Sequence, residues 1–164
     1  MNADSIVEHI PRLRRYARAL VGDRHSADDL VQDTLERACN KFHLWRTGSD
    51  LRAWLFAVMH NIFINQVRSA RHQLEQSMEE VPVVPTRATQ GDALELAEVE
   101  RALRILPAEQ REVLLLVAVE QMSYAQASRV LSLPVGTVMS RLSRARERMR
   151  AAMAGGQPAL KVVK

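Results

Sequence analysis

Apolar residues recur at three- and four-residue steps through most of this chain, a spacing that places them on one face of a helix. The steps are clear in Ile6–Val21, in 51–70 and in 135–153. No stretch sustains the strict alternation of apolar and polar residues expected of a half-buried strand. We therefore predict an all-α fold.

Helix-breaking and helix-capping residues divide this pattern. Gly22 predicts the end of the first helix, and Ser26 is the predicted N-cap of the second, with Asp29 as its acidic partner three residues on. That second helix is expected to bury Leu30, Val31, Thr34, Leu35 and Ala38. A loop is expected over 43–50. In the C-terminal half, the residues expected to face inward are Leu96, Val99, Leu103 and Leu106, and Pro107 is expected to end that helix. Ser123 is the predicted N-cap of a short helix, and a turn is expected after it at 132–134.

Charge is distributed in three blocks. Residues 1–73 hold 11 basic and 8 acidic side chains, and 99–164 hold 11 basic and 5 acidic ones, whereas 74–98 hold one basic and six acidic ones. The middle block also loses helical periodicity and contains Pro82 and Pro85. We predict two small helical domains, 1–73 and 96–154, joined by a flexible acidic linker at 74–95, with a disordered tail at 155–164. The basic blocks suggest a polyanionic partner, although ordinary solvated charge is the alternative.

The segment 123–150 has the form of a helix-turn-helix: a capped short helix, a tight turn and a helix rich in arginine. Such a second helix lies in the DNA major groove, so its first turn needs small or polar residues near the bases. Gly136, Thr137 and Ser140 meet that need. Base or phosphate contacts are predicted for Arg141, Arg144, Arg146 and Arg148, with Arg150 beyond them. The alternative is a basic amphipathic helix on a surface.

Two separate blocks resemble one family. The runs LPAEQREVLLL and PVGTV, with the arginines that follow, resemble region 4 of the extracytoplasmic-function sigma factors of bacterial RNA polymerase, group 4 of the sigma-70 family. ADDLVQDTLERA resembles their region 2.2, and LRAWLFAVMHNIFINQVRSARH resembles regions 2.3 and 2.4. The resemblance covers residues 5–153. It implies a σ2 and a σ4 domain with no σ3 domain between them.

The resemblance implies a function and a set of contacts. Such a protein binds core RNA polymerase and directs initiation at promoters by recognising −10 and −35 elements, often in a stress response and under a cognate anti-sigma factor. The acidic helix face would dock on the β′ clamp helices, and the σ4 surface near 114–119 would grip the β flap. The polymerase-binding residues would be Asp29, Gln32, Asp33 and Glu36. The −10 residues would be Trp45, Arg46, Ser49, Arg52, Asn61, Arg68 and Arg71, whereas Trp54 is expected in the core.

Some positions depart from the family pattern. Met139 stands where lysine or arginine is usual, which puts one contact near the −35 bases in doubt. Ser128 and Ser132 stand where alanine and glycine are common, and Asn65 stands where aspartate is frequent.

Other functional classes fit the sequence less well. Cys39 is the only cysteine, so no internal disulfide is possible, and it is expected to be a small core residue. No metal-ligand spacing, catalytic grouping or phosphate-binding loop is visible, so we expect neither an enzyme nor a cofactor. Without a signal pattern or a long apolar run, a cytoplasmic protein without membrane insertion is expected. The alternatives are a stand-alone helix-turn-helix regulator, which leaves 1–73 without a role, and an interaction module such as an anti-sigma antagonist, against which the arginine-rich helix argues.

Overall fold

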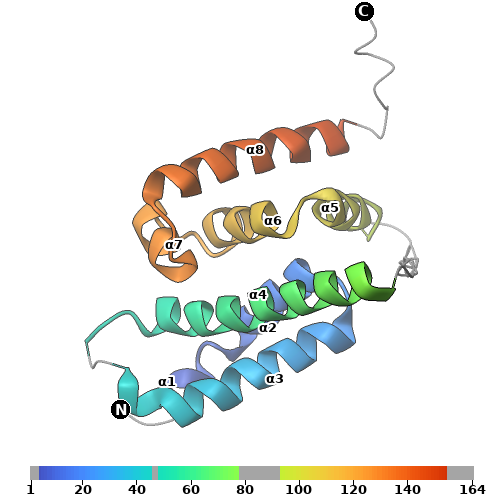
Figure 1. Cartoon of the computed structure of the whole chain (residues 1–164). Coiled ribbons are helices and arrows are strands. Elements are labelled where there is room, and N and C mark those ends of the chain that lie inside the picture. The colour runs from blue at the N-terminus through green and yellow to red at the C-terminus, as the bar shows by residue number, and fades with distance from the viewer. Residues whose placement is uncertain (1–3, 46–47, 78–92, 155–164) are drawn as a thin grey trace, which may run out of the picture.

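The computed structural model describes residues 4–45, 48–77 and 93–154, and the regular elements in these ranges are all helices (Figure 1). The all-α prediction is therefore confirmed. In chain order the elements are α1 (Asp4–Val7), α2 (Ile10–Val21), α3 (Arg24–Lys41), the short helix η1 (Phe42–Leu44), α4 (Leu51–Ser77), α5 (Ala93–Ile105), α6 (Ala108–Leu114), the π-helical turn η2 (Leu115–Val119), α7 (Tyr124–Leu131) and α8 (Val135–Met153).

The N-terminal half is built on α2, α3 and α4. Their apolar faces meet in a core in which Tyr16 and Phe56 pack edge to face, with ring centroids 4.9 Å apart. The single helix expected over Ile6–Val21 is instead two helices. Pro11 lies in the first turn of α2, where its missing N–H leaves no hydrogen bond unmade. Gly22 ends α2 with a left-handed φ of 81°, as predicted.

The C-terminal half contains the helix-turn-helix. Ser123 and Gln126 form a capping box at the start of α7, so the predicted Ser123 cap is confirmed. The turn before α8 places Ser132 at a left-handed φ of 53°, a conformation that glycine adopts with less strain. Ser128 Oγ donates to Leu133 O across the same turn. Leu96 was expected to face inward, but it is 59% exposed, and the buried residues of α5, Ala102 and Leu103, lie in its later turns.

The two halves pack against each other. α7 packs on α4 (Figure 1), and α2 contacts α5, α6 and η2. The buried apolar residues of both halves form one continuous core. The predicted domain limits fall close to helix ends: α4 continues four residues beyond 73 to Ser77, and α5 begins at Ala93. The middle of the expected linker, 78–92, and the expected tail, 155–164, lie outside the described residues.

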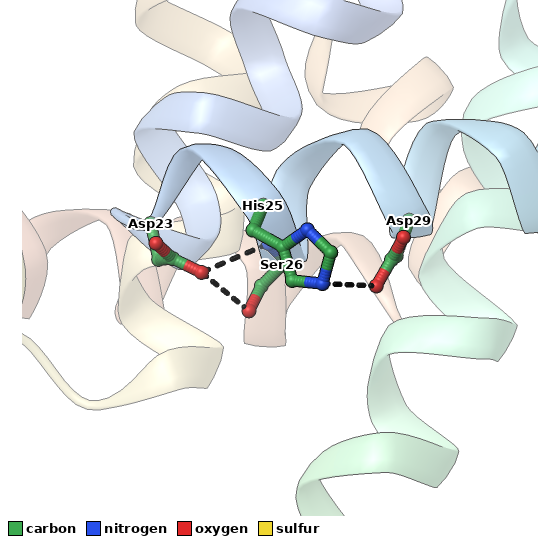
Figure 2. A network of polar contacts seen from close by, with 4 residues as sticks. All are labelled: Asp23, His25, Ser26 and Asp29. Atoms are coloured by element: carbon green, nitrogen blue, oxygen red, sulfur yellow. Dashed lines mark hydrogen bonds and ion pairs between the residues drawn. The ribbon is translucent and has the colours of Figure 1, made fainter.

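Two details of α3 correct the sequence analysis. The N-cap is Asp23, not Ser26: the Asp23 carboxylate accepts from Ser26 N at 2.9 Å and from Ser26 Oγ at 2.8 Å (Figure 2). Aspartate caps as well as serine does, so the helix begins three residues earlier. Cys39 is exposed and not part of the core. One helical residue is a rotation of about 100°, which turns Cys39 to solvent beside the buried Ala38.

The Asp23 cap gives a pH-dependent prediction. The Ser26 backbone and side-chain hydrogen bonds hold the pKa of Asp23 below its ordinary 3.8. A depressed pKa means that the stabilisation is present above the unfolded-state pKa and is lost as the pH falls through the folded-state value. Asp23→Ala should therefore lower the melting temperature at pH 7 but not well below pH 3.8. Asp23→Asn keeps a cap acceptor and should remain close to wild type at pH 7. An equal loss for Asp23→Ala at both pH values would contradict the prediction.

Candidate nucleic-acid and polymerase interfaces

The start of α8 presents small and polar groups to solvent. Gly136 is exposed, and a Cβ there would meet nothing within 4 Å. Ser140 is also exposed, and its hydroxyl donates to Thr137 O at 3.1 Å. Met139 is 50% exposed between them. Behind this face Val138, Leu142 and Ala145 are fully buried. The first turn of α8 is therefore held rigidly while its outer surface remains open to a ligand.

The arginines of α8 differ in exposure. Arg144, Arg146 and Arg148 are exposed, whereas Arg141 is half-buried. Arg141 is close enough to Glu112 of α6 for its charge to favour the ionised carboxylate. Of the four arginines predicted to contact bases or phosphates, Arg141 alone is thus turned partly toward the rest of the chain, and the predicted base reader Thr137 is half-buried as well.

The loop before α4 is less open than predicted. Trp45 is only 9% exposed and stacks on Phe42, with ring centroids 5.5 Å apart. Its Nε1 is buried and has no hydrogen-bond partner among the residues that the structure describes. Trp54 is half-buried against the core, which confirms its expected role. Arg46 lies outside the described residues. A groove of about 370 Å³ runs between this loop and α7, with Trp45 and Ser49 on one side and Arg129 on the other.

The remaining predicted −10 residues lie along α4. Asn61 and Arg68 are exposed. Arg52 is half-buried, and its Nη1 donates to Glu120 O at 2.7 Å. Arg71 Nη2 lies 3.7 Å from Glu109 Oε1, with both side chains largely solvated. Arg52 and Arg71 are therefore already engaged by the C-terminal half.

The acidic face of α3 is accessible along its length. Asp29, Gln32, Asp33 and Glu36 are all exposed. Asp29 Oδ2 lies 3.5 Å from His25 Nε2 one turn earlier (Figure 2), and the high exposure of both groups keeps that contact weak. The structure thus brings the four residues onto one solvent-facing surface.

A groove beside this face adds residues that the sequence analysis missed. It has a volume of about 780 Å³ and contains Gln32 and Glu36 on one wall and Arg14 and Arg18 on the other, with Cys39 also lining it. The i, i+4 spacing of the two arginines on the polar side of α2 was the available signal. The surface next to the acidic face is therefore of mixed charge.

Polar groups also meet where the two halves pack together. His60 Nδ1 of α4 lies 2.9 Å from both carboxylate oxygens of Glu112, which is 2% exposed. Burial raises the pKa of Glu112, and the His60 hydrogen bond and charge oppose that rise. Arg104 donates to Leu20 O and Ala19 O, and Arg111 Nη1 donates to Leu20 O at 2.7 Å.

The described residues offer neither a metal site nor a membrane-spanning helix. In 4–45, 48–77 and 93–154, no three His, Cys, Asp or Glu side chains gather as a metal site requires. In the same ranges no helix has the length and apolar character needed to cross a membrane.

Comparison with known proteins identifies the two halves. Residues 6–60 match the family described as the Sigma2 domain of PhyR, and residues 96–149 match Sigma-70, region 4. The sigma factor EcfG of Rhodopseudomonas palustris (strain TIE-1), an ECF RNA polymerase sigma factor, is 38% identical over 149 residues, which are 90% of this chain and 82% of that protein. The chain belongs to the extracytoplasmic-function (ECF) sigma factors. The ECF sigma factor SigM of Bacillus subtilis (strain 168) is 30% identical over 92% of this chain and 94% of its own length.

A solved structure agrees at the level of the whole fold. The sigma factor RpoE of Bartonella quintana, crystallised with the anti-sigma factor NepR, superposes with a TM-score of 0.82 at 33% identity, covering 94% of this chain and 97% of that one. As an ECF sigma factor with σ2 and σ4 domains, this protein binds core RNA polymerase and directs initiation at promoters. The N-terminal half is σ2, and the C-terminal half, with its helix-turn-helix, is σ4.

Proposed function

We propose a division of contacts within this sigma factor. The start of α8 reads the −35 element, the loop before α4 and the exposed side of α4 bind the −10 element, and the acidic face of α3 docks on core polymerase. The observation that carries the proposal is the first turn of α8. Its solvent side holds Gly136 and Ser140 beside the apolar Val135 and Met139, while Val138 on its inner side is fully buried. That surface can approach base edges while the helix keeps its fold and its packing on the rest of the chain.

The proposal extends to the cellular setting. The partner polymerase is in the cytoplasm, and the protein acts there as a specificity subunit without catalysing a reaction of its own. A cognate anti-sigma factor is proposed because the structurally similar RpoE was crystallised with one. A role in a stress response is proposed on the family resemblance alone.

Run-off transcription from a random promoter library tests the function directly. Purified protein with core polymerase should initiate at templates that share two separated elements. A stand-alone regulator would instead bind its site tightly without polymerase and give no transcripts. If saturating protein leaves core polymerase silent on every library member, the proposed function is wrong.

The two ends of α8 should have different roles. Arg141 lies near the start of the helix, close to the proposed base readers Thr137 and Ser140, whereas Arg148 is exposed two turns later. Arg141→Ala should relax sequence choice at one or two −35 positions by about 1–3 kcal/mol each. Arg148→Ala should weaken binding evenly and reduce the salt slope by about one unit.

Promoter-library selection at two salt concentrations measures both effects. The two variants remove the same side chain from the same helix, so each serves as the control for the other. Identical selectivity profiles would remove the distinction between base and phosphate contacts.

A further inference from the structure

The exposed side of α8 carries two apolar side chains where the helix begins. Val135 is 41% exposed and Met139 is 50% exposed, and the four-residue step between them places both on one face of the helix. The other large apolar side chain of α8 with such exposure is Met153, at the opposite end of the helix. Apolar groups that face water gain free energy when an apolar partner covers them. Val135 and Met139 therefore form an apolar strip that can favour one kind of partner over another.

Small residues surround Met139. Gly136 lies three positions before it, Ser140 follows it directly and Ser143 lies four positions after it, and all three are exposed. A Cβ on Gly136 would meet nothing within 4 Å, so the space beside Met139 is open. Met139 has the longest side chain of these four residues and extends beyond the other three. Its unbranched, polarisable thioether chain can adapt to the surface that covers it.

The charge of α8 favours DNA as the partner over an apolar protein surface. The helix carries five arginines and one acidic residue. Arg146 and Arg150 continue the stripe of Met139, seven and eleven residues later, and both are exposed. Arginines along such a helix contact phosphates and fix its position in the groove. The apolar strip precedes these cations at the end of the helix that enters the major groove first.

One base presents an apolar group in the major groove. Thymine carries a 5-methyl group there, which apolar side chains contact, whereas guanine offers O6 and N7 to the donors of lysine and arginine. Methionine has no donor, and its sulfur is only a weak acceptor. Met139 therefore cannot bind guanine as the lysine or arginine usual at this position would, but it can cover a methyl group. The side chain of Val135 extends that apolar surface by one turn.

We propose that the apolar strip of Val135 and Met139 contacts the 5-methyl group of a thymine in the −35 element and so selects thymine at that position. The inference rests on the proposed placement of α8 on the −35 element. Two residues, or about 200° around the helix, separate Met139 from both Thr137 and Arg141. These two polar side chains are half-buried, whereas Met139 is exposed. The strip and the polar residues therefore face different base edges.

The first measurement uses the wild-type protein bound to core polymerase on a promoter selected from the random library. Each thymine of the −35 element, on either strand, is replaced in turn by deoxyuridine, which lacks the 5-methyl group but keeps the hydrogen bonds of the base pair. Uracil opposite the strip should weaken promoter binding roughly fourfold, the factor that corresponds to about 0.8 kcal/mol for one buried CH₂ group. A −35 element without thymine on either strand, or one in which no uracil changes the affinity, overturns the proposal.

The converse measurement adds a methyl group. At the sensitive position the thymine is replaced by cytosine or by 5-methylcytosine, which have the same hydrogen-bonding groups. The promoter with 5-methylcytosine should bind roughly fourfold more tightly than the promoter with cytosine. Equal affinities would mean that the strip does not contact a methyl group, which also overturns the proposal.

Substitutions in the strip test which side chain makes the contact. Met139→Ala should keep the fold, because Met139 is half exposed and alanine favours a helix. Its uracil penalty should fall below about twofold, and the double variant Val135→Ala with Met139→Ala should show none. Met153→Ala is the matched control: it removes the same side chain, at 44% exposure, from the far end of α8 and should keep the full penalty. A full penalty in both strip variants would mean that uracil acts through the shape of the DNA, and the proposal would be wrong.

The outcomes also separate this inference from the proposed function. A library that yields no promoter refutes the proposed function, and the inference fails with it. Promoters with a defined −35 element that do not respond to uracil, but whose selection changes in Arg141→Ala, refute only the thymine contact. A uracil penalty that Met139→Ala relieves and Met153→Ala keeps supports both.

Discussion

Replacing Asp33 with arginine is expected to weaken binding to core RNA polymerase by on the order of 1–3 kcal/mol, or roughly 5- to 150-fold. Asp33 lies on the solvent-facing acidic surface of α3 between Gln32 and Glu36. The substitution changes attraction to a basic partner surface into repulsion. Because the side chain is exposed and no hydrogen bond of the helix depends on it, the melting temperature should stay close to that of wild type.

A fluorescence titration of labelled sigma factor with core polymerase measures the change. Glu98→Arg is the control, since it makes the same charge change at an exposed position of α5, away from the acidic face. Loss of affinity in Asp33→Arg alone supports docking through α3. Equal affinities for Asp33→Arg and wild type, with unchanged melting curves, would mean that this face is ordinary surface.

The fold follows closely from local sequence signals. The apolar spacing gives the helices, Gly22 ends α2, and Ser123 with Gln126 begins α7. The errors arise where two local signals compete. Asp23 and Ser26 can both cap α3, and the earlier residue is the cap observed because Ser26 then donates to Asp23 through both its backbone and its side chain.

Burial was harder to predict at the edges of a helix face. Ala38 is completely buried, but Cys39 is exposed, because adjacent helical residues point about 100° apart. Leu96 fits the inward spacing of α5 but is 59% exposed, whereas Leu103, two turns later on the same helix, is buried. Helical periodicity identifies the apolar face of a helix, whereas how much of that face is buried depends on which other element packs against it.

The contacts between σ2 and σ4 had no signal in the sequence. Arg104 and Arg111 bind backbone carbonyls, and any residue can offer a carbonyl, so no partner side chain marks the site. His60 and Glu112 are 52 positions apart and resemble ordinary helix residues. Such pairs are fixed by the packing of helices from distant parts of the chain. The exposed residues proposed to bind DNA, in contrast, could be proposed from a continuous motif in the sequence.

Replacing His60 with alanine should measure how much the hydrogen bond to the buried Glu112 contributes to the free energy of unfolding. His60→Ala leaves a carboxylate that is 2% exposed without its hydrogen-bonded partner, and such a loss typically costs about 3 kcal/mol of unfolding free energy. Tyr16, Glu109, Arg111 and Arg141 are other groups that interact electrostatically with Glu112. Of these the two arginines favour the charged carboxylate, but their charges are weak substitutes for a direct hydrogen bond.

The pH dependence of this loss has a definite sign. Burial raises the folded-state pKa of Glu112, so the carboxyl contributes fully below its unfolded-state pKa and its contribution is lost as the pH rises through the folded-state value. In His60→Ala, where the hydrogen bond that opposes the effect of burial is gone, urea unfolding should therefore show a lower stability at pH 8 than at pH 5. The double variant His60→Ala with Glu112→Gln carries no buried charge and should recover stability mainly at pH 8. A deficit in His60→Ala that is the same at both pH values, and that Glu112→Gln does not relieve, would mean that lost packing and not the buried charge sets the cost.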